Sequence, residues 1–224
     1  RIREDYLRVL RYIRFFLNYS KKKHNVKVTR IIKKNLQGFS KISPERLLDE
    51  FKKLVRSKGF LKLTKDKFCF EIINLIFPQF KNLSIFRNLN SFAKDNIKNV
   101  DFIFLISLMI IDGSDNVDYF IYKFNISKKD QKRLLLLNNF FSNKINNKTF
   151  SKNNLQKILY FNEKQSLLDL INFQIFKSKK VDKKLLEMIE FFKDKEPPLL
   201  PVRAITLMNK YNIHEGKKLG IMLK

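Results

Sequence analysis

The residues of this chain best suited to chemistry lie in its first eleven positions, where the acidic pair Glu4 and Asp5 is followed by Arg8 and Arg11. At about 100° per residue, a helix places Asp5 and Arg8 side by side and carries Arg11 about 60° further round. A carboxylate beside a guanidinium offers a hydrogen-bond acceptor next to a fixed fork of donors. Cytosine and adenine each carry an amine donor beside a ring-nitrogen acceptor, so this pair could bind either base.

The same pair would reject the other two bases. Uracil and guanine present a carbonyl in place of the amine, so the Asp5 carboxylate would face an oxygen with no proton between them. A structural interpretation stands beside this one: the acids favour the positive end of the helix dipole, and Glu4 or Asp5 pairs with Arg8. For the E-D-x-x-R pattern taken alone, the structural interpretation is the stronger one.

The elements that must position these residues are helices. Five glycines and five prolines in 224 residues leave few breaks, and apolar residues recur at helical spacing, as in Leu47, Leu48, Phe51 and Leu54. No strand–glycine loop–helix pattern for a nucleotide is present. The longest apolar run, from Phe102 to Ile111, is about half as long as a membrane span and predicts a buried helix. We therefore expect an all-α protein without a membrane partner.

Three regions separate along the chain. We call residues 1–56 the neck, 57–141 the body and 142–224 the tail, and expect them to form an elongated series of helices. A lysine-rich break at Lys21–Lys27 divides the neck. Its second half contains a helix start, where Ser43 can cap, Pro44 suits the first helical position, and Arg46 and Glu50 can pair four residues apart.

The charge indicates a polyanionic partner. Lys and Arg number 47 against 21 Asp and Glu, which gives a net charge of +26 and a pI near 10.1. The alternative is that a lysine-rich surface, as an AT-rich genome would encode, is simply solvated.

No metal site is expected in this chain. Cys69 is the only cysteine, which excludes an internal disulfide and a cysteine-based zinc site, and between Phe68 and Phe70 it is expected in the core. His24, among lysines, and His214, in a turn, are expected on the surface. A third group of possible ligands is Asp112, Asp115 and Asp118. We interpret it as a helix-ending turn, because a loop rarely holds carboxylates rigidly enough for two metal ions.

Four segments in order resemble class II tRNA nucleotidyltransferases, the CCA-adding enzymes, and their relatives the bacterial poly(A) polymerases. In this order they span essentially the whole chain from its first residue to its last, which makes the resemblance more specific than one motif. They are RIREDYLRVLRYIRF at the start, ISPERLLDEFKKLV at 42–55, FNISKKDQKRLLLL at 124–137 and PPLLPVRAITLMNKYNIHEGKKLGIMLK at 197–224.

The resemblance implies a role for each residue of the first motif. Asp5 and Arg8 would form a protein template for incoming CTP or ATP, Glu4 would hold Arg8 in place, and Arg11 would reach the triphosphate. The basic surface would hold the acceptor and T-arm side of a tRNA by its phosphates.

The resemblance also assigns residues further along the chain. Ser43, Glu45 and Arg46 would belong to a helix that braces the base-reading helix. A glycine-containing tail segment could let the backbone approach an RNA phosphate or could be a simple turn; it comprises Gly216, Lys217, Lys218 and Gly220.

The catalytic head of the family, with paired aspartates for Mg²⁺, would precede Arg1, so this chain alone is expected to bind tRNA without polymerising. The sequence departs from the family at Tyr6, where proline is common, and at Ala204 and Thr206, where the tail pattern has Gly and Asp. CCA addition and poly(A) addition stay open, as does a basic helical RNA-binding protein that never had a head. The expected location is the cytoplasm, with an organelle as the alternative, and the oligomeric state is left open.

Overall fold

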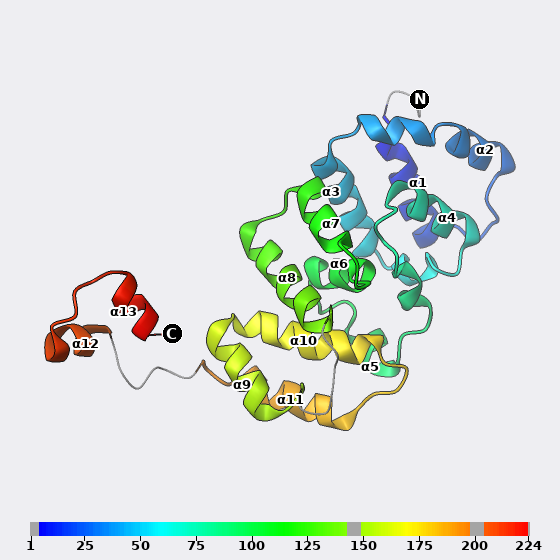
Figure 1. Cartoon of the computed structure of the whole chain (residues 1–224). Coiled ribbons are helices and arrows are strands. Elements are labelled where there is room, and N and C mark those ends of the chain that lie inside the picture. The colour runs from blue at the N-terminus through cyan, green and yellow to red at the C-terminus, as the bar shows by residue number, and fades with distance from the viewer. Residues whose placement is uncertain (1–4, 143–148, 198–203, 224) are drawn as a thin grey trace.

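The computed structural model describes residues 5–142, 149–197 and 204–223, and every regular element in these ranges is a helix. The all-α prediction is confirmed. Figure 1 shows the helices along the chain. Those in the first half are α1 (Leu7–Tyr19), α2 (Val26–Lys34), η1 (Leu36–Lys41), α3 (Pro44–Val55), η2 (Phe60–Lys62), α4 (Lys67–Ile76), η3 (Leu83–Arg87) and α5 (Ser91–Asn96). Those in the second half are α6 (Phe102–Ile110), α7 (Asn116–Phe124), α8 (Lys128–Ser142), α9 (Lys152–Phe161), α10 (Lys164–Lys177), α11 (Lys183–Lys193), α12 (Ala204–Tyr211) and α13 (Lys217–Met222).

The apolar run forms a buried helix, as predicted. It forms α6, whose residues are almost all buried, and Asp101 caps its start by accepting a hydrogen bond from the Phe104 amide at 2.9 Å. Among the described residues, no helix is long and apolar enough to cross a membrane. A helix that is apolar all round must be covered on every side, and α7, α8 and α10 are among the helices in contact with it.

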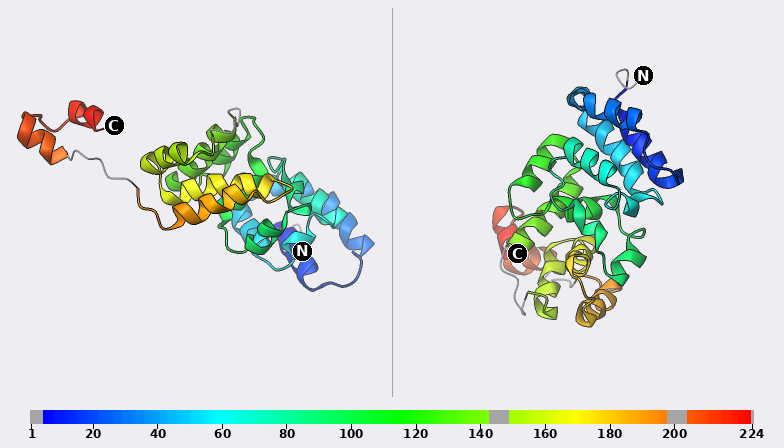
Figure 2. Two further views of the ribbon diagram at one scale, coloured as in Figure 1. Left: turned by 90° about the horizontal axis from the view of Figure 1, so that it is seen from below. Right: turned by 90° about the vertical axis from the view of Figure 1, so that its right-hand side faces the viewer.

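The hydrophobic core continues across the predicted boundary between neck and body. One cluster runs from Leu7 in α1 to Leu137 in α8 and takes in three residues of α10. A second, smaller cluster joins α9, α10 and α11. In Figure 1 and in the right-hand view of Figure 2, α1–α4 and α9–α11 lie at opposite ends of the part formed by α1–α11. Neither cluster includes a residue of α12 or α13. The division at residues 56 and 141 stays a prediction.

Helix α1 packs on α3 at the end of the molecule that carries the first motif. Its inward face buries Leu7, Leu10, Ile13 and Leu17. The end of α1 also approaches η2 closely: a side-chain carbon on Gly59 would lie 2.6 Å from the Leu17 carbonyl, so only glycine fits there. This packing fixes α1, which begins two residues after Asp5.

Helix α3 begins at Pro44, as predicted, but two local details of the prediction are wrong. Ser43 occupies the N-cap position, yet its side chain makes no capping hydrogen bond. No ion pair joins Arg46 to Glu50 in the described part of the chain, because Glu50 is buried against α1 while Arg46 is exposed.

Candidate functional site

Asp5 lies just before α1, which begins at Leu7, so it is held by the helix start and is not itself a helical residue. The Leu7 amide donates a hydrogen bond to Asp5 Oδ1 at 3.1 Å. Asp5 Oδ2 lies 3.5 Å from the Arg11 guanidinium. Arg8 is exposed in the first turn of α1. The carboxylate is thus fixed by a backbone donor and a cation, which is a more rigid placement than the sequence indicated.

Arg11 connects Asp5 to a buried acid on the neighbouring helix. Its Nε lies 3.4 Å from Glu50 Oε1, and Glu50 is only 6% exposed. Arg14 and Lys53 approach the same carboxylate at 3.9 and 3.1 Å. A buried carboxylate is costly unless cations lie beside it. Glu50 therefore joins α3 to Arg11 of the first motif by an ion pair.

The residues predicted to brace the first motif form no ion pair or hydrogen bond with Asp5 or Arg11 among the residues that the structure describes. Ser43, Glu45 and Arg46 are exposed on or beside the first turn of α3 and are not part of the Glu50 network. Glu4 lies outside the described residues, so its predicted hold on Arg8 stays a prediction. Sequence reasoning assigned no role to Glu50 beyond its pairing with Arg46, since its partners on α1 are more than thirty residues away along the chain.

A groove between α1 and the end of α3 combines exposed aromatic rings with basic side chains. We call it the α1/α3 groove; it encloses about 570 Å³ and is lined by Arg14, Phe15, Asn18, Tyr19, Lys53, Arg56, Ser57 and Lys58. Phe15 and Tyr19 are 54% and 78% exposed, and their rings stack with centroids 6.1 Å apart. The Arg14 guanidinium lies 5.1 Å from the Phe15 ring centroid. Exposed aromatic rings beside cations suit the stacking of bases and the contact of phosphates in single-stranded RNA.

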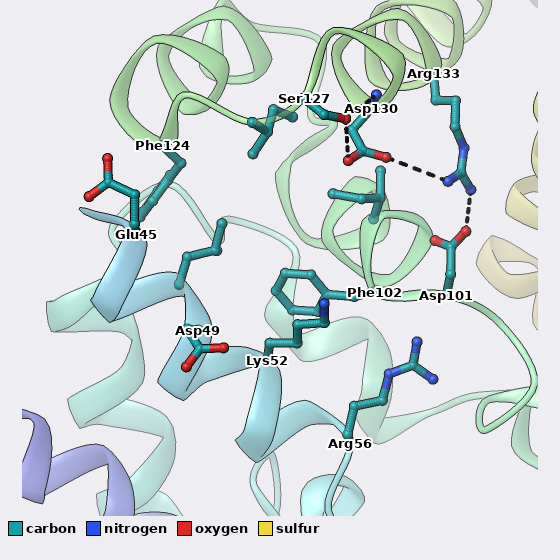
Figure 3. A pocket seen from close by; sticks show the side chains of 13 residues that line it. Glu45, Asp49, Lys52, Arg56, Asp101, Phe102, Phe124, Ser127, Asp130 and Arg133 are labelled. Atoms are coloured by element: carbon teal, nitrogen blue, oxygen red, sulfur yellow. Dashed lines mark hydrogen bonds and ion pairs between the residues drawn. The ribbon is translucent and has the colours of Figure 1, made fainter. Parts of the chain in front are cut away.

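A second cavity, of about 490 Å³, lies between α3 and the start of α8 (Figure 3). It gathers the carboxylates of Glu45, Asp49, Asp101 and Asp130. These four acids outnumber the three lining cations, and one of the cations, Arg133, lies 2.6 Å from Asp101 and 3.8 Å from Asp130 (Figure 3). A cavity with this balance of charge offers a polyanion little attraction.

The predicted tail contacts are exposed. Lys217 and Lys218 begin α13, and Gly216 precedes it with φ +150°. Gly220 is inside α13 and its amide donates to the Gly216 carbonyl at 3.1 Å, so the second glycine is part of a helix and not of a turn. Their contact with RNA stays a prediction.

Asp112, Asp115 and Asp118 lie in and after the turn between α6 and α7, as predicted. Asp112 Oδ1 accepts from the Ser114 amide at 3.1 Å and from its hydroxyl at 2.6 Å. All three acids are exposed, and Gly113 adopts a φ of +86° at the turn. The carboxylate of Asp112 therefore stabilises the turn that ends α6.

His24 is not a surface residue, and this prediction is wrong. Its side chain is 13% exposed and its ring stacks on Phe16, with centroids 3.5 Å apart. Tyr12 Oη lies 2.7 Å from Nδ1, and both oxygens of Asp66 lie 3.1 Å from Nε2. His214 is exposed, as predicted.

Cys69 is buried beside this histidine, as the core prediction required. Its Sγ lies 3.7 Å from His24 Nε2, and burial raises the pKa of the thiol above its ordinary value. The thiol is therefore protonated at neutral pH and is a poor nucleophile. The sequence carried one local signal of the cluster, the spacing D-x-x-C at the start of α4, whereas His24 is more than forty residues away.

A search of protein-family models finds no match to this chain, and a search of curated proteins finds none either.

Proposed function

We propose that this chain is the base-selecting and tRNA-binding part of a template-independent RNA nucleotidyltransferase that adds C and A, from CTP and ATP, to tRNA 3′ ends. The observation that carries the proposal is the Asp5 carboxylate, which is held in place at the start of α1 three residues before Arg8. The four segments that resemble the family support it.

The rigidity of the motif supports a role in selection. A base edge is discriminated when acceptor and donor are held in place before the base arrives, because a mobile pair can adapt to the wrong base. Asp5 is held by the Leu7 amide and by Arg11, which is itself held by the buried Glu50. The Asp5 side chain is 26% exposed, which leaves room for a ligand.

Arg11 has a different place in this proposal from the one the resemblance implies. It is 41% exposed and bridges Asp5 and Glu50. An arginine occupied by two carboxylates is better suited to orienting Asp5 than to binding a triphosphate. We therefore propose Arg11 as a positioning residue for the template carboxylate.

The α1/α3 groove supports the tRNA-binding part of the proposal. Its wall is shared with the base-reading helix, so a single-stranded 3′ end that stacked on Phe15 and Tyr19 would lie on the helix that begins beside Asp5. The net charge of +26 would supply the longer-range attraction for phosphates.

Phosphoryl transfer itself belongs, in this proposal, to a head N-terminal to Arg1 that would hold the Mg²⁺ ions. Among the described residues, the grouping of possible metal ligands is His24, Asp66 and Cys69. It contains one carboxylate and a thiol, so it does not fit a two-Mg²⁺ site, which needs several oxygen ligands.

The test of tRNA binding uses paired substitutions in the groove. Replacing both Phe15 and Tyr19 with alanine should weaken tRNA binding by about tenfold, because base stacking on an aromatic ring contributes about 1–3 kcal/mol. Fluorescence anisotropy of a labelled tRNA at several salt concentrations measures this. The control is Tyr122→Ala, which removes an 86% exposed ring from α7. Equal affinities for the two variants, or no tRNA binding at low salt, would count against the proposal.

A second function is favoured by the same groove: a basic helical RNA-binding protein without a catalytic head. The groove and the positive charge fit this function equally well. In such a protein, however, the Asp5 carboxylate would only stabilise the start of α1. Substitution of Asp5 therefore separates the two, as does the length of the natural protein. A poly(A) polymerase, which would add A alone, is a variant of the first proposal.

A further inference from the structure

We propose that His24, Asp66 and Cys69 form a zinc-binding site that fastens the connection between α1 and α2 to the start of α4. The ligand atoms are His24 Nε2, one carboxylate oxygen of Asp66 and Cys69 Sγ. The proposal is independent of the function proposed above.

Two of the three distances between these atoms are close to those of a coordination tetrahedron. One ligand atom from each residue can be chosen so that all lie within 4.8 Å of one another. With bonds of about 2.0–2.3 Å, tetrahedral zinc separates a nitrogen and an oxygen ligand by about 3.4 Å and a sulfur and a nitrogen ligand by about 3.6 Å. The structure has 3.1 Å from Nε2 to each Asp66 oxygen and 3.7 Å from Sγ to Nε2. Shifts of a few tenths of an ångström would bring these two distances to their tetrahedral values, and the third, between Sγ and the Asp66 oxygen, is no longer than 4.8 Å.

Asp66 and Cys69 are held by the start of α4. Asp66 is its N-cap residue, and its Oδ1 accepts a hydrogen bond from the Cys69 amide at 2.9 Å. The two side chains are consequently placed together by the helix itself. A carboxylate that is already hydrogen-bonded to the backbone is a well-oriented ligand.

The third ligand is oriented by the aromatic side chains of α1 and α4. His24 stacks on Phe16 and packs against Phe68, with ring centroids 3.5 and 4.8 Å away. Tyr12 Oη lies 2.7 Å from Nδ1. In the tautomer in which Nδ1–H donates to the Tyr12 oxygen, Nε2 presents its lone pair to the Asp66 and Cys69 side. Such an outer hydrogen bond accompanies nearly every metal-bound histidine.

The donor set selects zinc among the common ions. One nitrogen, one oxygen and one sulfur ligand suit Zn²⁺, whereas Mg²⁺ and Ca²⁺ prefer oxygen alone. Cys69 would give up its thiol proton to solvent on binding zinc. The resulting thiolate and the Asp66 carboxylate together balance the charge of a divalent cation, which matters in a chain of net charge +26. The exposed fractions of 13% for His24 and 24% for Asp66 leave a side open for a water as the fourth ligand.

This site departs from the sequence prediction that the chain binds no metal. One cysteine does exclude a site built of cysteines, but a mixed site needs only one. The ligand that the sequence did not reveal is His24, which is more than forty residues from Asp66 and Cys69 and was wrongly expected on the surface.

The test is titration of the metal-stripped full chain with Co²⁺, a spectroscopic substitute for Zn²⁺. We expect one equivalent to bind, with visible bands of a tetrahedral ion and a thiolate-to-cobalt charge-transfer band, and Zn²⁺ to displace it. Cys69→Ser should abolish the charge-transfer band. Asp66→Asn, which keeps a side chain able to cap α4, should weaken binding at least tenfold while the helical circular dichroism is retained.

His214→Asn is the matched control, because it removes an exposed histidine from outside the cluster. It should bind Co²⁺ like the unaltered chain. Folded protein that binds neither ion, or a charge-transfer band that persists in Cys69→Ser, would overturn the proposal.

Discussion

Replacing Arg133 with alanine should lower the free energy of unfolding by about 3–5 kcal/mol, the cost of leaving a buried charge without its partner. Arg133 is 6% exposed on α8, and its guanidinium donates to Asp169 Oδ2 at 2.6 and 2.9 Å. Asp169, on α10, is 2% exposed. A further bond of 2.6 Å joins Arg133 to Asp101 at the start of α6. The one side chain therefore connects three helices.

Urea denaturation followed by circular dichroism measures this loss. The double variant Arg133→Met with Asp169→Leu should be more stable than Arg133→Ala, because an apolar pair leaves no charge unpaired. Lys129→Ala is the control, since it breaks the exposed ion pair with Glu163 and should cost less than about 1 kcal/mol. A similar small loss for Arg133→Ala and Lys129→Ala would show that the buried network does not join the helices.

The second large effect is expected at the template carboxylate. Asp5→Asn preserves the size of the side chain and an oxygen for the Leu7 amide, but its amide can also donate to a carbonyl. Discrimination of C and A against U and G should fall by about 5- to 150-fold, the equivalent of about 1–3 kcal/mol for one base contact. Incorporation of C and A should fall as well, while affinity for tRNA stays unchanged.

Rates of incorporation of each nucleotide by the natural protein that contains this chain measure this effect, and tRNA affinity is measured beside them. Asp49→Asn is the control, because Asp49 is exposed on α3 and paired only with Lys53 among the ion pairs of the described residues. If tRNA binding and incorporation fell by the same factor, the assignment of Asp5 to the base template would be wrong. Unchanged rates would favour the RNA-binding protein without a head.

The sequence predicted those parts of the fold that depend on neighbouring residues. Proline at the first helical position predicted the start of α3, and the uninterrupted apolar run predicted the buried α6. Cys69, between two phenylalanines, is buried as expected. In each case the relevant physics, backbone geometry or hydrophobicity, operates within a few residues.

The sequence failed where a polar side chain has a distant partner. Glu50 was assigned to Arg46, one turn before it, but tertiary packing turns it toward Arg11 and Arg14 on α1. His24 stands among lysines, yet Tyr12 and Asp66 from two other elements enclose it. Such contacts become visible only when the chain is folded, and both now belong to candidate sites.

The most direct test of the central claim is incorporation of the four nucleotides into a tRNA that lacks its 3′ CCA, by the natural protein isolated from its own cells. If Asp5 and Arg8 select the base, C and then A are added, and UTP and GTP are rejected. Addition of A alone, without need for a tRNA, would indicate poly(A) polymerase. No incorporation, or equal incorporation of all four nucleotides, would contradict the claim that Asp5 and Arg8 select the base.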